Sequence, residues 1–163
     1  MAQNKAKIWK EISEIKFSNC SEILEEYKKK KIHASPWIEN IVKKYNFSFS
    51  NDFKLIKLVR MKVEELGFYN QTTLKEIYKK IRDKNLELVP PEIALYSRLI
   101  YDEQTTGEWL RFATPLDSMI DTDNVPHLPK IGKALNTYFV ETYWSYPNAV
   151  FHPHNEFVVI EKN

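Results

Sequence analysis

With 163 residues, 43% of them hydrophobic and 28% charged, the chain has the length and composition of one soluble globular domain, or one domain with a helical appendage. Its net charge is only +2, but residues 1–84 carry 19 Lys and Arg against 11 Asp and Glu, while residues 85–163 carry 5 against 11. No apolar run approaches the roughly 20 residues that span a bilayer, and the first residues lack a secretory signal. The single cysteine, Cys20, excludes an internal disulfide and a cysteine-based zinc cluster. We therefore expect a cytoplasmic protein without membrane association.

The uneven charge has two interpretations. A lysine-rich first half is typical of a protein that binds a nucleic acid through that half. Alternatively, the two halves attract each other and the lysines cover solvated helix faces. The four lysines at 28–31 leave both interpretations open, because lysines at the end of a helix also complement its dipole.

In chain order, the first predicted elements are helices. Residues 7–17 place isoleucines at helical spacing, although so many isoleucines leave a strand open. Asn19 and Glu22 have the spacing of a capping box, which predicts a helix after them. Ser35 followed by Pro36 predicts another helix start, because serine is a favoured N-cap and proline suits the first helical position.

The middle of the chain mixes strand and helix signals. Residues 55–61 favour a strand, but a helix is left open because the apolar residues keep neither period throughout. Gly67 predicts a left-handed cap after a short helical turn. Thr73 and Glu76 form a second capping box, which predicts a helix to about Asp83.

The segment 90–115 combines prolines with polar and aromatic side chains. Its opening Pro-Pro pair predicts a short helix. A β-prone stretch at 99–101, turn residues at 102–107 and alternating residues at 109–113 then predict a β-hairpin over 98–113. We take six side chains gathered there as the candidate binding surface: Arg98, Tyr101, Gln104, Glu108, Trp109 and Arg111.

The last third of the chain predicts strands at 127–131, 137–144 and 156–161. The expected fold is therefore α+β, with N-terminal helices packed on a C-terminal antiparallel β-meander of about five strands. We expect a single domain over 1–163. Its helical N-terminal part would be 1–50, and its α+β core 51–163, with the hairpin 98–113 and the meander 127–161.

Signals for catalysis are weak. His152 and His154 flank Pro153 and could join His127 in a zinc site, but no carboxylate stands at motif spacing. The sequence contains no P-loop, no dinucleotide-binding fingerprint, no nucleophile elbow and no HExxH, and it has only 3 glycines. We therefore predict no metal and no cofactor, and we assign no catalytic residue.

Several motifs resemble a family of small bacterial proteins over about residues 35–160. They are ELGF at 65–68, TLKEIY at 73–78 and, above all, PPEIALYSRLIYDEQTTGEWLRF at 90–112. The last block is similar to PxEVGPxLRLQYxDQPxGEWLxIAM, with Leu95 where the family often has proline and Thr105 in place of the turn proline. The family has no established activity, so the resemblance implies a fold and no function. Its most specific motif covers Arg98, Tyr101, Gln104, Gly107, Glu108 and Trp109.

The leading functional prediction is a non-enzymatic interaction module that binds a protein partner around residues 98–111. The alternative is a small nuclease- or toxin-like enzyme that acts on RNA through the basic first half and through His127, His152 or His154. An RNA affinity that falls with salt, and a loss of cleavage when the histidines are replaced, would distinguish the alternative from the leading prediction.

Overall fold

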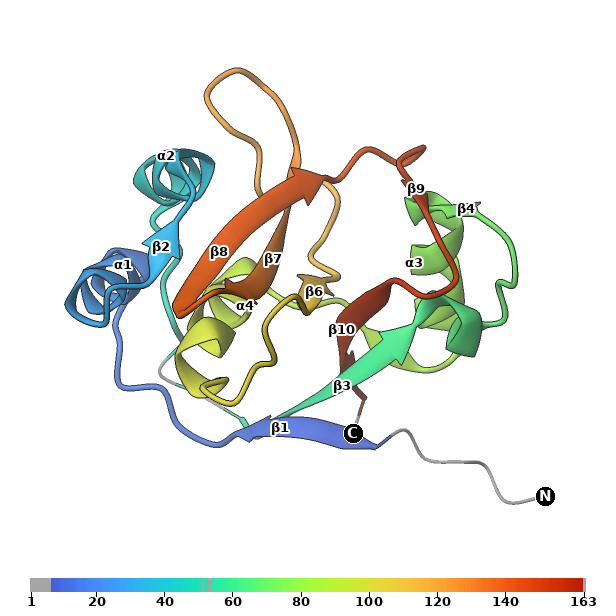
Figure 1. Ribbon diagram of the computed structural model, residues 1–163, viewed down its shortest axis with the longest axis horizontal. Coiled ribbons are helices and arrows are strands. Elements are labelled where there is room, and N and C mark those ends of the chain that lie inside the picture. Colours follow the sequence, from blue (N-terminus) through green and yellow to red (C-terminus); the bar gives the residue numbers. More distant parts are fainter. Residues whose placement is uncertain (1–6, 51, 53, 163) are drawn as a thin grey trace.

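The computed structural model describes residues 7–50, 52 and 54–162 (Figure 1). Its helices are α1 (Cys20–Lys29), α2 (Pro36–Tyr45), α3 (Leu74–Asp83) and α4 (Pro91–Ser97), with short 3-10 helices η1 (Val63–Leu66) and η2 (Arg98–Ile100). Its strands are β1 (Ile8–Ile12), β2 (His33–Ala34), β3 (Ile56–Lys62), β4 (Thr72–Thr73), β5 (Leu86–Glu87), β6 (Trp109–Phe112), β7 (His127–Ala134), β8 (Thr137–Trp144), β9 (Val150–Phe151) and β10 (Glu156–Glu161). None of the described helices is long and apolar enough to cross a membrane.

Eight of these strands form one mixed sheet. Its order is β1-β3-β10-β6-β7-β8-β2, and β5 pairs with β10. The β10–β6 and β2–β8 pairs are parallel, whereas the other pairs are antiparallel. A separate two-stranded ladder joins β4 to β9.

The predicted arrangement of helices followed by a five-stranded antiparallel meander is therefore wrong. The segment 1–50 contributes β1 and β2 as well as helices, and the sheet draws strands from the whole described chain. The last strand, β10, does not follow β8 in a meander but lies between β3 and β6. Its residues Phe157, Val158 and Val159 are all fully buried, so β10 needs cover on both faces and is suited to the middle of the sheet.

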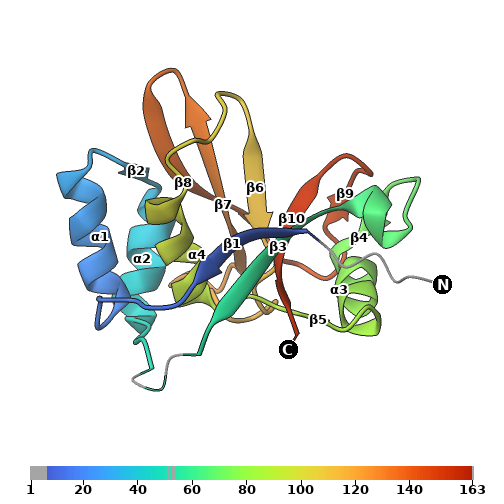
Figure 2. The same ribbon diagram turned by 90° about the horizontal axis from the view of Figure 1, so that it is seen from below.

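Helices cover the two faces of the sheet unequally. One apolar core joins α1, α2 and α4 to the face that carries Leu58, Phe112 and Val158. The second core joins α3 and η1 to the opposite face, at Val59 and Phe157. Figures 1 and 2 show α1, α2 and α4 gathered at one end of the molecule and α3 alone at the other. We call the face of the sheet that carries Val59 and Phe157 the α3 face.

The predicted helix starts are confirmed. The Asn19 side chain accepts a hydrogen bond from the backbone N–H of Glu22 at 3.2 Å, and Thr73 accepts one from Glu76 at 3.4 Å. Ser35 caps α2, with Pro36 as the first helical residue. Gly67 adopts the left-handed conformation expected of a C-cap, with φ of 99°. The strands predicted at 55–61, 127–131, 137–144 and 156–161 are also present, with shifts of a few residues.

Residues 7–17 do not form the predicted helix. Ile8–Ile12 is instead strand β1, which pairs with β3 at the edge of the sheet. A register shift between Ile8 and Lys10 changes the alternation of side chains, so that Ile12 belongs to the first core and Ile8 packs against the second. The helical spacing of the isoleucines thus reflects an irregular strand whose apolar residues serve both cores.

The predicted hairpin at 98–113 is also wrong. Its first arm is the short helix η2, and only the second arm is a strand, β6, which pairs with β7 and β10. The carbonyl oxygen of Tyr101, which a hairpin strand would use in its ladder, accepts a hydrogen bond from the Arg98 guanidinium at 2.6 Å. The turn glycine, Gly107, does have a positive φ of 89°, and its N–H donates to the carbonyl of Lys133.

Candidate functional site

The Arg98 guanidinium lies inside the protein, where 1% of the residue is exposed. It donates to the side-chain oxygen of Gln104 at 2.5 Å, to the carbonyl of Gly132 at 3.0 Å and to the carbonyl of Tyr101 at 2.6 Å. It also lies 4.6 Å from the ring centroid of Tyr138. Burial lowers the pKa of Arg98. Within the described chain no carboxylate lies within 4 Å of it, so carbonyl dipoles and an aromatic ring stabilise its charge.

A second polar network adjoins the first. Arg60 on β3 forms two hydrogen bonds with Glu156, at 2.8 and 2.9 Å, and one with Glu108 at 3.0 Å. The hydroxyl of Tyr101 accepts a hydrogen bond from Arg60 at 3.1 Å and donates one to Glu108 at 2.7 Å. Burial and the hydrogen bond to Glu108 raise the pKa of Tyr101 to about 12. The network ties β3 and β10 to the loop that precedes β6.

Four of the six predicted site residues therefore belong to networks that hold the fold together. Arg98, Tyr101 and Gln104 are at most 5% exposed, which leaves them little contact area for a partner. Glu108 is half-buried and already paired with Arg60. The partners of these residues on β3, β7 and β10 are far away in the sequence, so the local motif gave no sign that its polar groups are satisfied internally.

The remaining two predicted residues, Trp109 and Arg111, point away from the first core. They alternate on β6 with the buried residues Leu110 and Phe112 of the first core, and so they lie on the α3 face of the sheet. The Arg111 guanidinium lies 5.7 Å from the ring centroid of Tyr143. The Nε atom of Arg111 is buried without a hydrogen-bond partner among the described residues. Burial lowers the pKa of the Arg111 guanidinium.

A lysine that the sequence did not single out completes this group. Lys130 on β7 is the direct cross-strand neighbour of Arg111. Its ammonium lies 4.9 Å from the ring centroid of Trp109 and 5.9 Å from that of Tyr143. Burial and then the charge of Arg111 lower the pKa of Lys130, while Glu141 on the next strand acts in the opposite direction.

Trp109, Arg111, Lys130 and Tyr143 form what we call the cation–aromatic patch. Trp109 packs against neither apolar core, and all four residues are half-buried. In the described structure no carboxylate lies within 4 Å of either cation. Like charges directly opposite each other on neighbouring strands destabilise a sheet. The patch therefore presents two cations without a close counter-ion, each held against aromatic rings.

The histidines are not gathered in one place. His127 is buried on β7, where its ring contacts Asp121 at 2.7 Å and Thr142 at 3.0 Å and stacks on Trp37. His152 and His154 stack on each other in the loop after β9, with ring centroids 5.7 Å apart. Across the described residues, no three His, Cys, Asp or Glu side chains are arranged to hold a metal ion.

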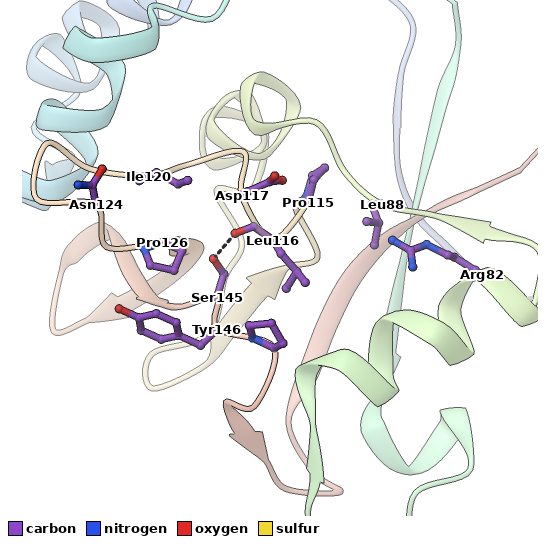
Figure 3. A pocket seen from close by; sticks show the side chains of 11 residues that line it. Arg82, Leu88, Pro115, Leu116, Asp117, Ile120, Asn124, Pro126, Ser145 and Tyr146 are labelled. Atoms are coloured by element: carbon purple, nitrogen blue, oxygen red, sulfur yellow. Dashed lines mark hydrogen bonds between the residues drawn. The ribbon is translucent and has the colours of Figure 1, made fainter.

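A hollow of about 490 Å³ lies between the end of α3, the loop before β7 and the loop after β8. Figure 3 shows the side chains that line it. Three prolines, at 115, 126 and 147, contribute to its wall, and Arg82 and Asp117 are its charged residues. The Ser145 hydroxyl, at its centre, donates to the carbonyl of Leu116 at 2.7 Å. None of the six predicted site residues lines this hollow.

Comparison with protein-family models, with curated proteins and with solved structures found no match to this chain. The resemblance of residues 90–112 to a bacterial family therefore stays a prediction from the motif alone.

Proposed function

We propose that the protein is a non-enzymatic interaction module that binds an acidic segment of a protein partner through the cation–aromatic patch. The observation that carries the proposal is the cross-strand pair of Arg111 and Lys130, which lack a close carboxylate and rest on the rings of Trp109 and Tyr143.

A partner carboxylate would supply the close counter-ion that, among the described residues, neither cation has within 4 Å. The planar guanidinium of Arg111 suits a two-point hydrogen bond with a carboxylate. Trp109 and Tyr143 add apolar area with few rotatable bonds, which is typical of residues that dominate binding energy at protein interfaces. The half-buried aromatic rings also limit the water around both cations, which strengthens an ion pair formed there.

An acidic protein segment suits the patch better than a nucleic acid does. Proteins that bind nucleic acids non-specifically neutralise several phosphates along a basic track. Here the patch has two cations, and Glu141 stands opposite Lys130 on β8. The lysines at 28–31 belong to the end of α1 and the turn after it, away from this face. The alternative of an RNA-cleaving enzyme gains no support from histidines that lie in separate surroundings.

The test uses two synthetic peptides of equal length, one alternating glutamate with tyrosine and the other alternating glutamine with tyrosine. Each is titrated into isotope-labelled protein at about 0.15 M salt and followed by NMR. We expect the acidic peptide, but not the neutral one, to shift the signals of Trp109, Arg111 and Lys130. The affinity should fall as salt rises.

Two double variants make the test specific. Arg111→Gln with Lys130→Gln should weaken acidic-peptide binding by about tenfold or more. Lys75→Gln with Lys79→Gln removes the same charge from exposed positions of α3 and should leave binding unchanged. Equal binding by both double variants would reject the patch as the binding site. A tighter, patch-specific response to a short RNA would favour the nucleic-acid alternative.

A further inference from the structure

The two edges of strand β8 differ. Its inner edge pairs with β7 along the whole strand, from Thr137 to Trp144. Its outer edge pairs only with β2, at Phe139 and Val140. The second half of β8 is thus an edge strand, as Figure 1 shows, where β2 lies beside only the first part of β8.

The reason that β2 ends is visible in its hydrogen bonds. The N–H of Ser35 donates to the carbonyl of Val140 at 2.9 Å and extends the ladder by one step. The carbonyl of Ser35, however, accepts from Ile38 and Glu39, because Pro36 begins α2. The chain leaves the sheet at this point, and the ladder along β8 stops.

The next backbone groups on this edge have no partner in the described structure. Along a strand, alternate residues direct both their N–H and their C=O to the same edge. Since the carbonyl of Val140 faces outward, the N–H and C=O of Thr142 face outward too. The neighbour of Thr142 on β7 is Pro129, which has no N–H to donate. This fits a Thr142 backbone that points away from β7. Among residues 7–50, 52 and 54–162, none forms a hydrogen bond to the Thr142 backbone on the outer side.

A space for an added chain lies at this edge. A pocket of about 260 Å³ is lined by Ser35, Trp37, His127 and residues 141–144 of β8. Trp37 is 43% exposed and Trp144 is 58% exposed, although large aromatic side chains usually bury most of their area. Glu141 is the acidic residue of the pocket wall, and none of the described lysines or arginines lines the pocket. The Glu141 carboxylate lies 4.0 Å from Nε2 of His33 on β2.

Apart from the charge of Glu141, the edge lacks the common features that keep exposed strands from pairing. Native edge strands are commonly protected by lysine, proline, a bulge or a covering loop. The sequence Glu-Thr-Tyr-Trp at 141–144 has neither lysine nor proline, and its pairing with β7 runs without a register shift. Among the described residues, no segment completes the ladder along 141–144.

We propose that the outer edge of β8 at 141–144 binds an extended segment of another protein as an added strand in line with β2. Backbone hydrogen bonds to Thr142 would hold the segment, which is the mode known as β-strand addition. Its apolar side chains would contact Trp37, and a lysine or arginine would lie next to Glu141. This inference does not depend on the cation–aromatic patch, of whose four residues only Tyr143 also lines the pocket.

The experiment begins with selection of short linear peptides from a random displayed library against the whole protein. We expect the selected sequences to alternate apolar residues with lysine or arginine. One selected peptide is then synthesised with and without methyl groups on alternate backbone nitrogens. Methylation should lower its affinity by about tenfold or more, since it removes the N–H groups that a strand must donate. The two alternating sets of nitrogens are methylated in separate peptides, because only one set faces β8. Unchanged affinity for both methylated peptides would overturn the proposal.

Variants of the protein locate the peptide. Trp37→Ala should weaken binding by about tenfold, whereas Tyr69→Ala, at a residue that is 78% exposed between η1 and β4, should not. Thr142→Pro removes the outward N–H and should abolish binding, while Thr142→Val keeps the N–H and should preserve it. If Thr142→Pro does not fold, the methylated peptide and Trp37→Ala still decide.

Two other outcomes would also overturn the proposal. One is NMR shifts that map the peptide away from residues 141–144. The other is a concentration-dependent dimer that occupies this edge, since the occupant would then be a second copy of the chain. Analytical ultracentrifugation of the protein alone distinguishes that case.

Discussion

The indole of Trp109 lies against the backbone of Gly132 on the neighbouring strand. A Cβ atom built on Gly132 would come within 2.5 Å of the Trp109 ring, closer than a real contact allows. The two residues are cross-strand partners in the β6–β7 ladder. Because position 132 lacks a side chain, the indole can approach the sheet and remain 4.9 Å from the ammonium of Lys130.

Gly132→Ala should therefore destabilise the protein by roughly 1–3 kcal/mol, the usual cost of forcing a methyl group into a filled site. The cost should largely disappear when Trp109 is also replaced by alanine, because the clash is between these two residues. Urea unfolding of the two single variants and the double variant measures this coupling. Additive effects would show that the cost of Gly132→Ala does not come from contact with Trp109.

Arg98 should resist even its most similar replacement. A lysine at this position cannot reach the three acceptors that the guanidinium binds, and it would bury a strongly hydrated charge. We expect Arg98→Lys to lower the free energy of unfolding by about 2 kcal/mol or more. Arg82→Lys on the exposed end of α3 is the control and should change stability by less than about 0.5 kcal/mol. Similar unfolding midpoints for the two variants would contradict this role of Arg98.

Structural features with a local signal could be predicted from the sequence. The N-caps at Asn19, Ser35 and Thr73 are each recognised by residues within three positions, and each is present. The position of β10 could not be predicted in this way. It depends on a parallel pairing with β6, about 45 residues earlier in the chain, for which the sequence has no short-range mark.

In the candidate site, too, features with a local signal could be predicted and features that depend on long-range pairing could not. Trp109 and Arg111 could be placed on one face of a strand from the sequence, because they alternate with apolar residues. Lys130 was missed because only the register of β6 against β7 makes it the neighbour of Arg111. Arg98 is predicted from the sequence to lie on the surface, but it is buried. The carbonyl oxygens that accept its hydrogen bonds, on β7 and at Tyr101, are brought to it only by the folded backbone, so the sequence pattern does not reveal them.

Asp121 should make stability depend on acid pH. Burial alone would raise its pKa, but hydrogen bonds from His127 and from the N–H groups of Val125 and Asp123 lower the pKa below its usual value. A carboxyl group with a depressed pKa in the folded state stabilises the fold above its unfolded pKa of about 3.9. That contribution is lost as pH falls through the folded pKa.

Asp121→Asn should therefore lose less of its free energy of unfolding than the wild type does between about pH 6 and pH 3. The asparagine oxygen can still accept the two backbone N–H groups. Asp123→Asn, at an exposed position of the same loop, should follow the wild-type profile. Parallel profiles for all three proteins in urea unfolding would exclude Asp121 as a source of acid sensitivity.

Cys20 should be unreactive in the folded protein. It is the first residue of α1 and is fully buried, and burial together with the charge of Glu92 raises the pKa of its thiol to about 12. Near pH 8 the reactive thiolate fraction is then lower by roughly a thousandfold than for a free cysteine. An aromatic disulfide reagent that releases a coloured thiolate on reaction should detect one thiol per chain in urea. In the absence of urea it should detect almost none. Rapid labelling of the native protein would mean that α1 leaves the core frequently.

Lys130→Gln should stabilise the protein while it weakens the proposed binding of acidic segments. Burial and the neighbouring Arg111 lower the pKa of Lys130, so its charged form is less favourable in the folded chain than in the unfolded chain. Removing the charge relieves a cross-strand repulsion, and we expect a gain of roughly 0.2–1 kcal/mol that shrinks at high salt. Lys133→Gln, on the same strand but facing the other side at the Tyr138 ring, should give no such gain. If Lys130→Gln instead unfolds at lower urea concentration, contact of the ammonium with Trp109 outweighs the repulsion, and the patch is held together by its cations.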